Sequence, residues 1–214
     1  MTNLDSRSLT YVNTFGRRFT RPGQVRYRVG SAAAICRPSD EEFPFTIDVA
    51  KGQGGKQHNI AVELRGDRFE TDPPELTIAE GDVVLWHSPS PAAGYVIQGD
   101  GEAGSFDSSS LTNDVLYTHA FGTPGEYEWV DAIGRSVSGL VTVTTLDTSD
   151  RKQCGEWVDA LERGTLVVID GNNSDPAEVS IVAGQTVLFA IVAADGITVT
   201  DARFLPGERA PSEK

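Results

Sequence analysis

Short runs in which apolar and polar residues alternate recur along most of the chain. Residues 43–49 and 137–143 alternate throughout, and residues 75–79 alternate just before the apolar run 83–86. A period of two is typical of strands that bury one face. Turn-forming residues separate these runs about every 8–12 positions, which indicates an antiparallel β-sandwich rather than alternating strands and helices. We therefore predict an all-β fold.

One segment, residues 149–162, has a helical pattern instead. Asp150 is a suitable N-cap, and Gly164 is a suitable stop. The apolar residues between them fall at helical spacing, at Cys154, Trp157, Val158 and Leu161. We expect a short linker helix here, and a flexible tail over residues 206–214.

The sequence also repeats itself. Residues 72–86 match residues 175–189 without a gap at an offset of 103, and residues 110–125 match residues 8–23 at an offset of 102. Two separate matches at nearly one offset indicate a duplicated domain.

The order of the matched halves predicts an unusual domain organisation. Residues 56–146 would form one complete domain, residues 1–50 the second half of another, and residues 163–205 its first half. The two end segments would then pair with each other. They could do so within one chain, as a circular permutation, or between chains, as a swap or a head-to-tail assembly.

The central unit resembles the cupredoxins, the blue-copper family of plastocyanins and azurins. The resemblance covers nearly all of that unit and rests on four segments, residues 74–86, 106–108, 117–129 and 139–143. It implies two Greek-key cupredoxin-like β-sandwiches, one complete and central, the other assembled from the N- and C-terminal segments.

The function of that family depends on two His, one Cys and usually one Met, which hold type 1 copper for electron transfer. Carried over to this chain, the upstream His falls at Tyr95, the Cys at Asp131, the second His near Gly134 and the Met near Val137. The resemblance therefore implies that the copper site has been lost and that no cofactor is bound.

The other copy has no ligands at the matching positions either. There the first His falls near Ile197 and the Cys near Val29. In the central unit, Tyr95 and Asp131 would form a polar pair where copper stands in the family. This pair is either a structural hydrogen bond that replaces the metal or a site for a small ligand.

The three histidines do not form a metal-binding pattern. His58, His87 and His119 are scattered, and we expect His87 and His119 to point away from the core residues Trp86 and Phe121. The sequence also has no nucleophile elbow, phosphate-binding loop or His-rich metal spacing. We therefore expect no catalytic residues and no identifiable small-molecule substrate.

Charge is distributed unevenly along the chain. The formal net charge is −13, but residues 1–37 hold seven arginines and one acid, for +6, whereas residues 146–214 carry −6. The acidic balance argues against nucleic acid or an anionic membrane as a partner. The basic residues Arg17, Arg18, Arg21, Arg26 and Arg28 are either a solvated face or a contact for an acidic surface, in this chain or the next.

Two further features concern the cellular environment. The chain has no apolar run of about 18 residues, and its start lacks a basic leader followed by an apolar stretch, so we expect a cytoplasmic protein. Cys36 and Cys154 are either two reduced thiols or one bridge.

These features together favour a non-catalytic, cupredoxin-like binding or assembly protein that has a protein partner or self-associates through its split domain. A copper electron-transfer protein with an unconventional site is one alternative. An auxiliary subunit of a larger oxidoreductase is another, because cupredoxin domains commonly occur fused to or beside oxidases.

Overall fold

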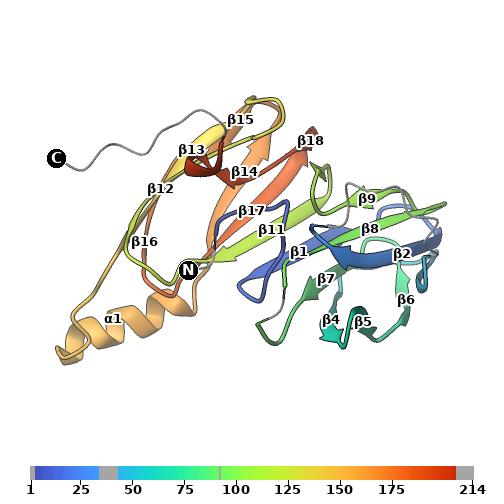
Figure 1. Cartoon of the computed structure of the whole chain (residues 1–214), viewed down its shortest axis with the longest axis horizontal. Helices are drawn as coiled ribbons and strands as arrows, with labels where there is room; N and C mark the ends of the chain where they lie inside the picture. Colours follow the sequence, from blue (N-terminus) through green and yellow to red (C-terminus); the bar gives the residue numbers. More distant parts are fainter. Residues whose placement is uncertain (1–2, 34–42, 92, 206–214) are drawn as a thin grey trace.

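The computed structural model describes residues 3–33, 43–91 and 93–205 of the 214-residue chain, and they form an all-β fold with one α-helix (Figure 1). The helical elements are α1 (Arg151–Leu161) and a short 3₁₀ turn, η1 (Ala202–Phe204). The strands, in chain order, are β1 (Asn13–Arg18), β2 (Gly23–Ser31), β3 (Phe45–Ala50), β4 (Gln57–Arg65), β5 (Arg68–Asp72), β6 (Glu75–Ala79), β7 (Val83–His87), β8 (Tyr95–Gly101), β9 (Phe106–Asp107), β10 (Leu111–Thr112), β11 (Val115–Ala120), β12 (Gly125–Val130), β13 (Ser138–Thr144), β14 (Thr165–Asp170), β15 (Asn173–Asp175), β16 (Glu178–Val182), β17 (Thr186–Ala193), β18 (Asp195–Ile197) and β19 (Thr200–Asp201).

One eight-stranded sheet runs through the whole molecule in the order β15-β14-β17-β11-β1-β7-β4-β5. Directly paired residues point to the same side of a sheet. One row across the six central strands is at most 1 % exposed at every position, and its members are Val167, Phe189, Tyr117, Phe15, Trp86 and Ile60. Burial of this row joins both halves of the molecule in one hydrophobic core.

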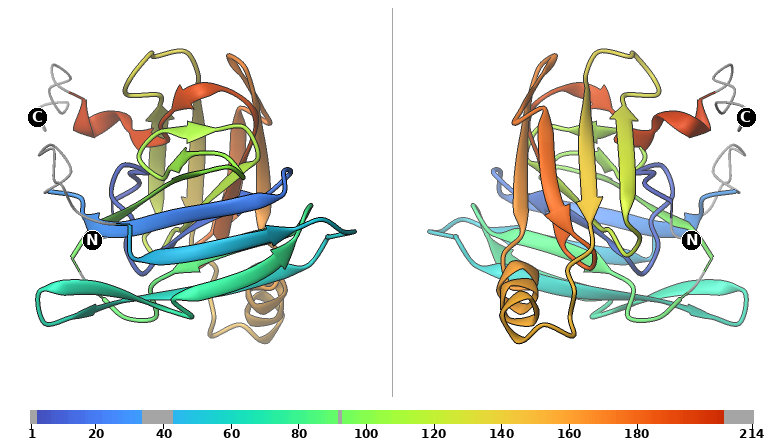
Figure 2. Two further views of the ribbon diagram at one scale, coloured as in Figure 1. Left: turned by 90° about the vertical axis from the view of Figure 1, so that its right-hand side faces the viewer. Right: turned by 90° about the vertical axis from the view of Figure 1, so that its left-hand side faces the viewer.

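Two smaller sheets complete the layers and make two sandwiches that lie side by side (Figures 1 and 2). Their orders are β6-β3-β2-β8-β9 and β16-β13-β12-β19. In each sandwich an edge-on aromatic contact joins the two facing sheets. Tyr27 meets Trp86 edge-on at 5.6 Å between ring centroids, and Trp129 meets Phe189 edge-on at 5.3 Å. These pairs occupy matching positions, so the two sandwiches share this aromatic contact.

The halves pair differently from our prediction. β1, β2 and β3 pair with β7, β8 and β6, while β11, β12 and β13 pair with β17, β19 and β16. Apart from residues 4–6, which bond to residues 199–201, each sandwich is therefore built from consecutive residues. The prediction that residues 56–146 form a domain alone and that residues 163–205 complete residues 1–50 is wrong. An offset gives the distance between equivalent residues and not the residue at which a repeat begins.

The two repeats meet at a two-fold pseudosymmetric seam. β1 and β11 are equivalent strands, and they pair antiparallel with Phe15 directly opposite Tyr117. These two residues are 102 positions apart, which is the repeat offset itself. The seam is therefore arranged like the interface of a symmetric dimer, contained within one chain.

Two short segments cross this seam reciprocally. The N–H of Ser6 donates to the Val199 carbonyl (2.9 Å), and the N–H of Ser108 donates to the Ile97 carbonyl (2.9 Å). Ser6 and Ser108 are equivalent, and both are fully buried. Each repeat thus lends a segment to the sandwich of the other.

The helix expected over residues 149–162 is α1, which begins after its N-cap Asp150 and joins β13 to β14 within the second sandwich. It lies at one end of that sandwich's strands (Figure 2). Its main anchor is the Trp157 indole N–H, which donates to the Ala183 carbonyl (2.9 Å). In the described part of the chain, no helix combines the length and the apolar composition needed to cross a bilayer.

Candidate functional site

Contrary to our prediction, the positions that the resemblance aligns with the cupredoxin copper ligands do not come together. Tyr95 opens β8 in the first sandwich, opposite Ser31 of β2. Asp131 follows β12 in the second sandwich and bonds to Thr198. Because Asp131 and Ile197 both belong to the second sandwich, Asp131 meets the segment that contains Ile197 instead. The prediction of a Tyr95–Asp131 pair is wrong.

The Asp131 carboxylate holds a loop together. It is 1 % exposed and accepts the backbone N–H groups of Gly134 (2.8 Å), Thr198 (3.0 Å) and Ile133 (3.1 Å), and the hydroxyl of Ser136 (3.1 Å). Burial pushes its pKa upward, but these hydrogen bonds outweigh burial and hold the pKa below its usual value. Its oxygens are committed to the protein's own groups, which is a structural role.

The rest of this end of the second sandwich is an open cleft, and its lining residues do not form a set of metal ligands. Val137 is buried, and its carbonyl accepts the Asp131 N–H (2.9 Å). The cleft has a volume of about 490 Å³ and lies between Gly134 and the segment that ends at Ile197. Ile133, 63 % exposed, also lines it. None of these residues supplies a soft metal donor.

The corresponding end of the first sandwich, around Tyr95, is hydrophobic. Tyr95 is fully buried, and its ring lies 5.8 Å from that of Phe69. Burial raises the pKa of the phenol far above its usual value, and within the described residues its hydroxyl has no hydrogen-bond partner. Val29 lies on the adjoining strand, opposite Ile97.

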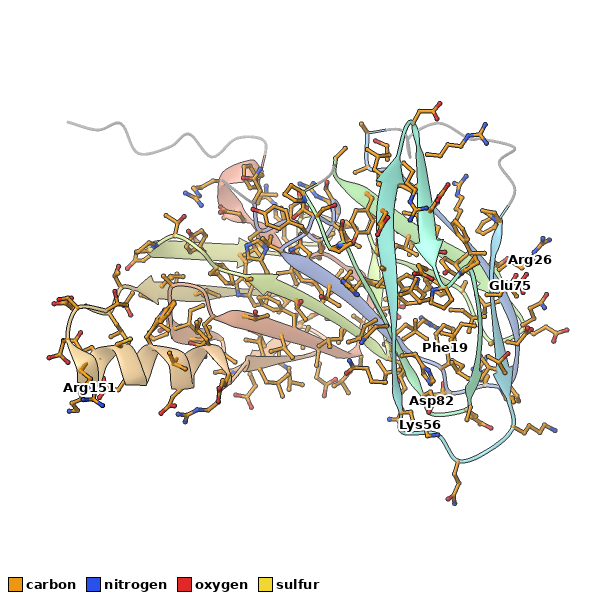
Figure 3. All side chains as sticks on the ribbon, turned by 90° about the horizontal axis from the view of Figure 1, so that it is seen from below. Phe19, Arg26, Lys56, Glu75, Asp82 and Arg151 are labelled. Atoms are coloured by element: carbon orange, nitrogen blue, oxygen red, sulfur yellow. The ribbon has the colours of Figure 1, made fainter. Side chains whose placement is uncertain are left out.

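The histidines are separated, as the sequence indicates. His58 bonds to Asp82 (2.9 Å), which also accepts the backbone N–H groups of Ala79 (3.0 Å) and Lys56 (2.8 Å). Those backbone bonds, followed by the one from His58, lower the Asp82 pKa strongly. Lys56 and Asp82 lie next to each other in Figure 3. Across residues 3–33, 43–91 and 93–205, no group of three His, Cys, Asp or Glu residues could hold a metal ion.

His119 is placed differently from our prediction. It lies in β11, two residues before Phe121, so both side chains face inward. Both are buried, and their ring centroids are 4.6 Å apart. Our expectation that His119 points away from Phe121 is therefore wrong, because a period of two keeps residues i and i+2 on one face. His87, adjacent to Trp86, does point to the opposite side.

A single tautomer of His119 fits its surroundings. The Asn13 amide oxygen accepts the N–H (2.9 Å) and the hydroxyl (2.8 Å) of Thr10, which assigns the amide nitrogen to the side that faces His119 Nδ1, at 2.8 Å. Nδ1 is therefore an acceptor, and the ring hydrogen lies on Nε2. Burial lowers the pKa of His119 to about 4, against the opposing effect of Asp201, so the ring is neutral at pH 7.

The five arginines do not form one basic face. Arg17 turns inward, and burial lowers its pKa, with Asp114 opposing the shift. Arg18, Arg21 and Arg26 are exposed. Arg26 lies near Glu75 at the first-repeat end of the molecule, far from Arg151 (Figure 3). Arg28 donates to the Gln98 side chain (2.8 Å). A contact with an acidic partner stays a prediction for the four outward arginines, and burial removes Arg17 from it.

The two cysteines cannot be compared directly. Cys154 lies half-buried on α1. Cys36 lies outside the described residues, so the choice between two thiols and a bridge stays open.

A cavity of about 310 Å³ lies beside the seam in the second repeat. Six of its lining residues are Leu4, His119, Phe121, Tyr127, Asp201 and Arg203. Arg203 binds the Asp201 carboxylate through Nε and Nη2, and its guanidinium lies 5.5 Å from the centre of the Tyr127 ring. His119 and Asp201 are each 2 % exposed. Buried polar groups, an aromatic wall and a concave surface coincide in this cavity.

The chemistry of this cavity favours binding over reaction. With Nδ1 occupied by Asn13, His119 presents an N–H donor at Nε2 and has no lone pair to act as a base. The Asp201 carboxylate is occupied by Arg203. The Tyr127 hydroxyl donates to the Thr123 carbonyl (2.8 Å).

Sequence reasoning did not single out Leu4, Asn13, Asp201 or Arg203. The signal was available in the repeat itself, because Arg17 aligns with His119 and Gly99 with Asp201. Differences between equivalent positions of two repeats mark the places where one repeat has acquired its own chemistry. No family model matches the chain, and no curated protein or solved structure matches it either.

Proposed function

We propose that the chain is a non-catalytic binding protein made of two cupredoxin-like repeats that have no type 1 copper site. One observation carries this proposal: the carboxylate at the position of the copper cysteine, Asp131, is used entirely to bond the loop around it. This use of Asp131 supports a structural role for the position that the resemblance aligns with the copper cysteine.

The cupredoxin-like assignment is supported by the architecture of both repeats. Each has two facing sheets, and each combines one parallel pair with antiparallel pairs in both of its sheets, β4–β7 and β3–β6 in the first repeat, β14–β17 and β13–β16 in the second. The matched motifs therefore occupy corresponding strands of the two sandwiches.

The proposal is tested by adding copper to the purified protein. We expect no intense visible absorption with Cu(II), and less than about 0.1 equivalent retained after desalting, because among the described residues no thiolate or histidine pair stands at the positions aligned with the copper ligands. The Asp131→Cys variant is a useful control, since a single thiolate without two histidines should not produce the band either. A strong visible band in the unmodified protein would show that a copper site exists and would overturn the proposal.

A second candidate function, self-association, is favoured by the outer side of the eight-stranded sheet. Twelve residues in two rows across six strands form what we call the outer face: Val168, Ala190, Leu116, Gly16, Leu85 and Asn59 in one row, and Leu166, Leu188, Thr118, Thr14, His87 and Ala61 in the other. None of them is Asp, Glu, Lys or Arg, although 23 % of the chain is charged.

The borders of this face are charged. The hairpin β4–β5 brings Glu63, Arg65 and Glu70 together at one edge, and Asp175 lies at the other. An apolar centre with a charged rim is the usual composition of a protein interface. Six strands about 4.8 Å apart and about 17 Å long cover roughly 500 Å² per copy, so two copies would bury roughly 1,000 Å², the lower limit for a specific dimer.

We therefore expect a weak dimer of this chain through the outer face. Light scattering after size exclusion should show a mass that rises with protein concentration. Leu166→Glu, at a residue that is 52 % exposed, should abolish the rise, while Thr77→Glu on an exposed strand of another sheet should not. A constant monomeric mass at high concentration would exclude self-association.

A further inference from the structure

The cavity of the second repeat has a filled counterpart in the first. Phe106 is equivalent to Leu4, because Ser108 and Ser6, two residues further on, make the same bonds across the seam. The Phe106 ring enters the first sandwich and lies 5.3 Å from the Trp86 ring and 6.1 Å from the Phe15 ring. Leu4 is smaller and leaves the matching space open.

The Arg17 side chain fills more of the corresponding space in the first repeat. Its guanidinium lies 5.5 Å from the centre of the Phe106 ring and 5.8 Å from that of Phe19. In the second repeat the equivalent residues are His119, Leu4 and Phe121. The shorter imidazole ends at the cavity wall and does not cross the space.

The glycine beneath Phe106 confirms how tightly the first repeat is filled. A Cβ on Gly99 would stand 2.4 Å from the Phe106 ring. The equivalent residue of the second repeat is Asp201, which carries a full side chain because Leu4 leaves room for it. The second repeat has therefore exchanged a packed aromatic core for a cavity with its own polar groups.

We propose that this cavity binds a small, uncharged aromatic molecule that carries a hydrogen-bond acceptor. The inference rests on the binding function proposed above and names its ligand class. His119 Nε2–H is the donor, and no residue in the described part of the chain accepts it. Phe121 and Tyr127, whose rings meet edge-on at 5.0 Å, provide the aromatic wall.

The charge state of the ligand follows from Asp201 and Arg203. Their charges neutralise each other in a bidentate pair, so neither is left to attract an ion of opposite sign. An anion would lie beside the buried Asp201 carboxylate, and a cation would find that carboxylate already occupied. A neutral ligand avoids both costs.

The size of the cavity suits one substituted ring. At about 310 Å³ it is larger than the cavity of roughly 150 Å³ that accommodates benzene in another protein. A ligand of about nine non-hydrogen atoms in a partly open site should bind with a dissociation constant of roughly a millimolar or less.

Acetophenone is a suitable probe, because it combines one ring with one carbonyl acceptor. Titrated into ¹⁵N- and ¹³C-labelled protein, it should shift the signals of residues around the cavity and give NOEs to the rings of His119 and Phe121. Cyclohexyl methyl ketone, which lacks the aromatic ring, and ethylbenzene, which lacks the acceptor, should each bind at least about tenfold more weakly.

Leu4→Phe restores in the second repeat the residue that fills the first, and it should weaken acetophenone binding at least about tenfold. Leu64→Phe, the same substitution at an exposed leucine of β4 in the first sandwich, is the matched control and should leave binding unchanged. The NOEs locate the probe in the unmodified protein, so the test holds even if Leu4→Phe folds poorly.

No binding of acetophenone at 10 millimolar, or NOEs at another place, would overturn the proposal. Equal binding of all three probes would do so as well, because it would remove both the ring and the acceptor as requirements. Any of these results would leave the copper-free binding function to be judged by the copper titration, so the two failures are distinguishable.

Discussion

Ser6 and Ser108 stand 102 residues apart and make the same bond in opposite directions across the seam. Ser6 Oγ accepts the Val199 N–H at 3.0 Å, and Ser108 Oγ accepts the Ile97 N–H at 2.9 Å. Each serine also donates its own backbone N–H to the carbonyl of the same residue, Val199 or Ile97. The repeats are therefore connected by exchanged segments and not only by the shared sheet.

Replacing either serine should destabilise the protein. Ser6→Ala or Ser108→Ala leaves a buried backbone N–H without an acceptor, which costs about 1–3 kcal/mol. Urea unfolding of each variant measures this cost. Ser180→Ala, on an exposed strand position, is the control and should change stability by less than about 0.5 kcal/mol. Two serine variants as stable as the control would show that the exchanged segments contribute little.

A glycine pair tests how tightly Phe106 fills the first repeat. Gly99→Ala would place a Cβ 2.4 Å from the Phe106 ring, whereas Gly30→Ala meets nothing within 4 Å. We expect Gly99→Ala to lower stability by about 1–3 kcal/mol and Gly30→Ala to have little effect. The double variant Gly99→Ala/Phe106→Leu imitates the second repeat, so the two changes should be non-additive in a double-mutant cycle. Strict additivity would contradict the proposed equivalence of Phe106 and Leu4.

Asp131 offers a test of the structural role of its carboxylate. Asp131→Ala removes the acceptor of the buried Thr198 N–H and of two loop N–H groups, and should cost roughly 3 kcal/mol. Thermal unfolding followed by circular dichroism measures it. Asp159→Ala, on the exposed side of α1, should be nearly neutral. A small effect at Asp131 would leave its carboxylate available for another role.

The sequence was sufficient for the all-β class and the helix. Alternation over residues 43–49 and 137–143 corresponds to β3 and β13, because a sheet with one buried face imposes a period of two. The helical spacing of Trp157 and Leu161 corresponds to α1. These features are local and can be recognised without knowing what packs against them.

The boundaries of the repeats and the cavity required the structure. The offset of 102 fits a split domain and two consecutive domains equally well, and only the pairing of β1 with β7 decides between them. The resemblance suggested the wrong starting point, and with it the wrong partner for Asp131. The cavity depends on the exchange of Leu4 into the second sandwich, a contact about 200 residues apart in the chain that no local pattern encodes.

His119 makes the stability of the seam dependent on pH. Its pKa is about 4 in the folded protein, against 6.5 for an ordinary histidine, because the ring is buried. Because folding lowers this pKa, the contribution of the neutral ring to stability is fully present above pH 6.5. It is lost as the pH falls towards 4. Over that window we expect a loss of up to about 3 kcal/mol, since one pKa unit corresponds to about 1.4 kcal/mol. Protonation would also place an N–H at Nδ1 against the Asn13 amide.

Urea unfolding at several pH values between 7 and 4.5 measures this dependence, above the range in which the lowered pKa values of Asp82 and Asp131 take effect. His119→Gln retains an acceptor for Asn13 but does not titrate, so its stability should fall much less over the same window. Ser180→Ala should follow the unmodified protein. If His119→Gln loses stability as steeply as the unmodified chain, the acid sensitivity arises elsewhere and the neutral tautomer of His119 does not hold the seam.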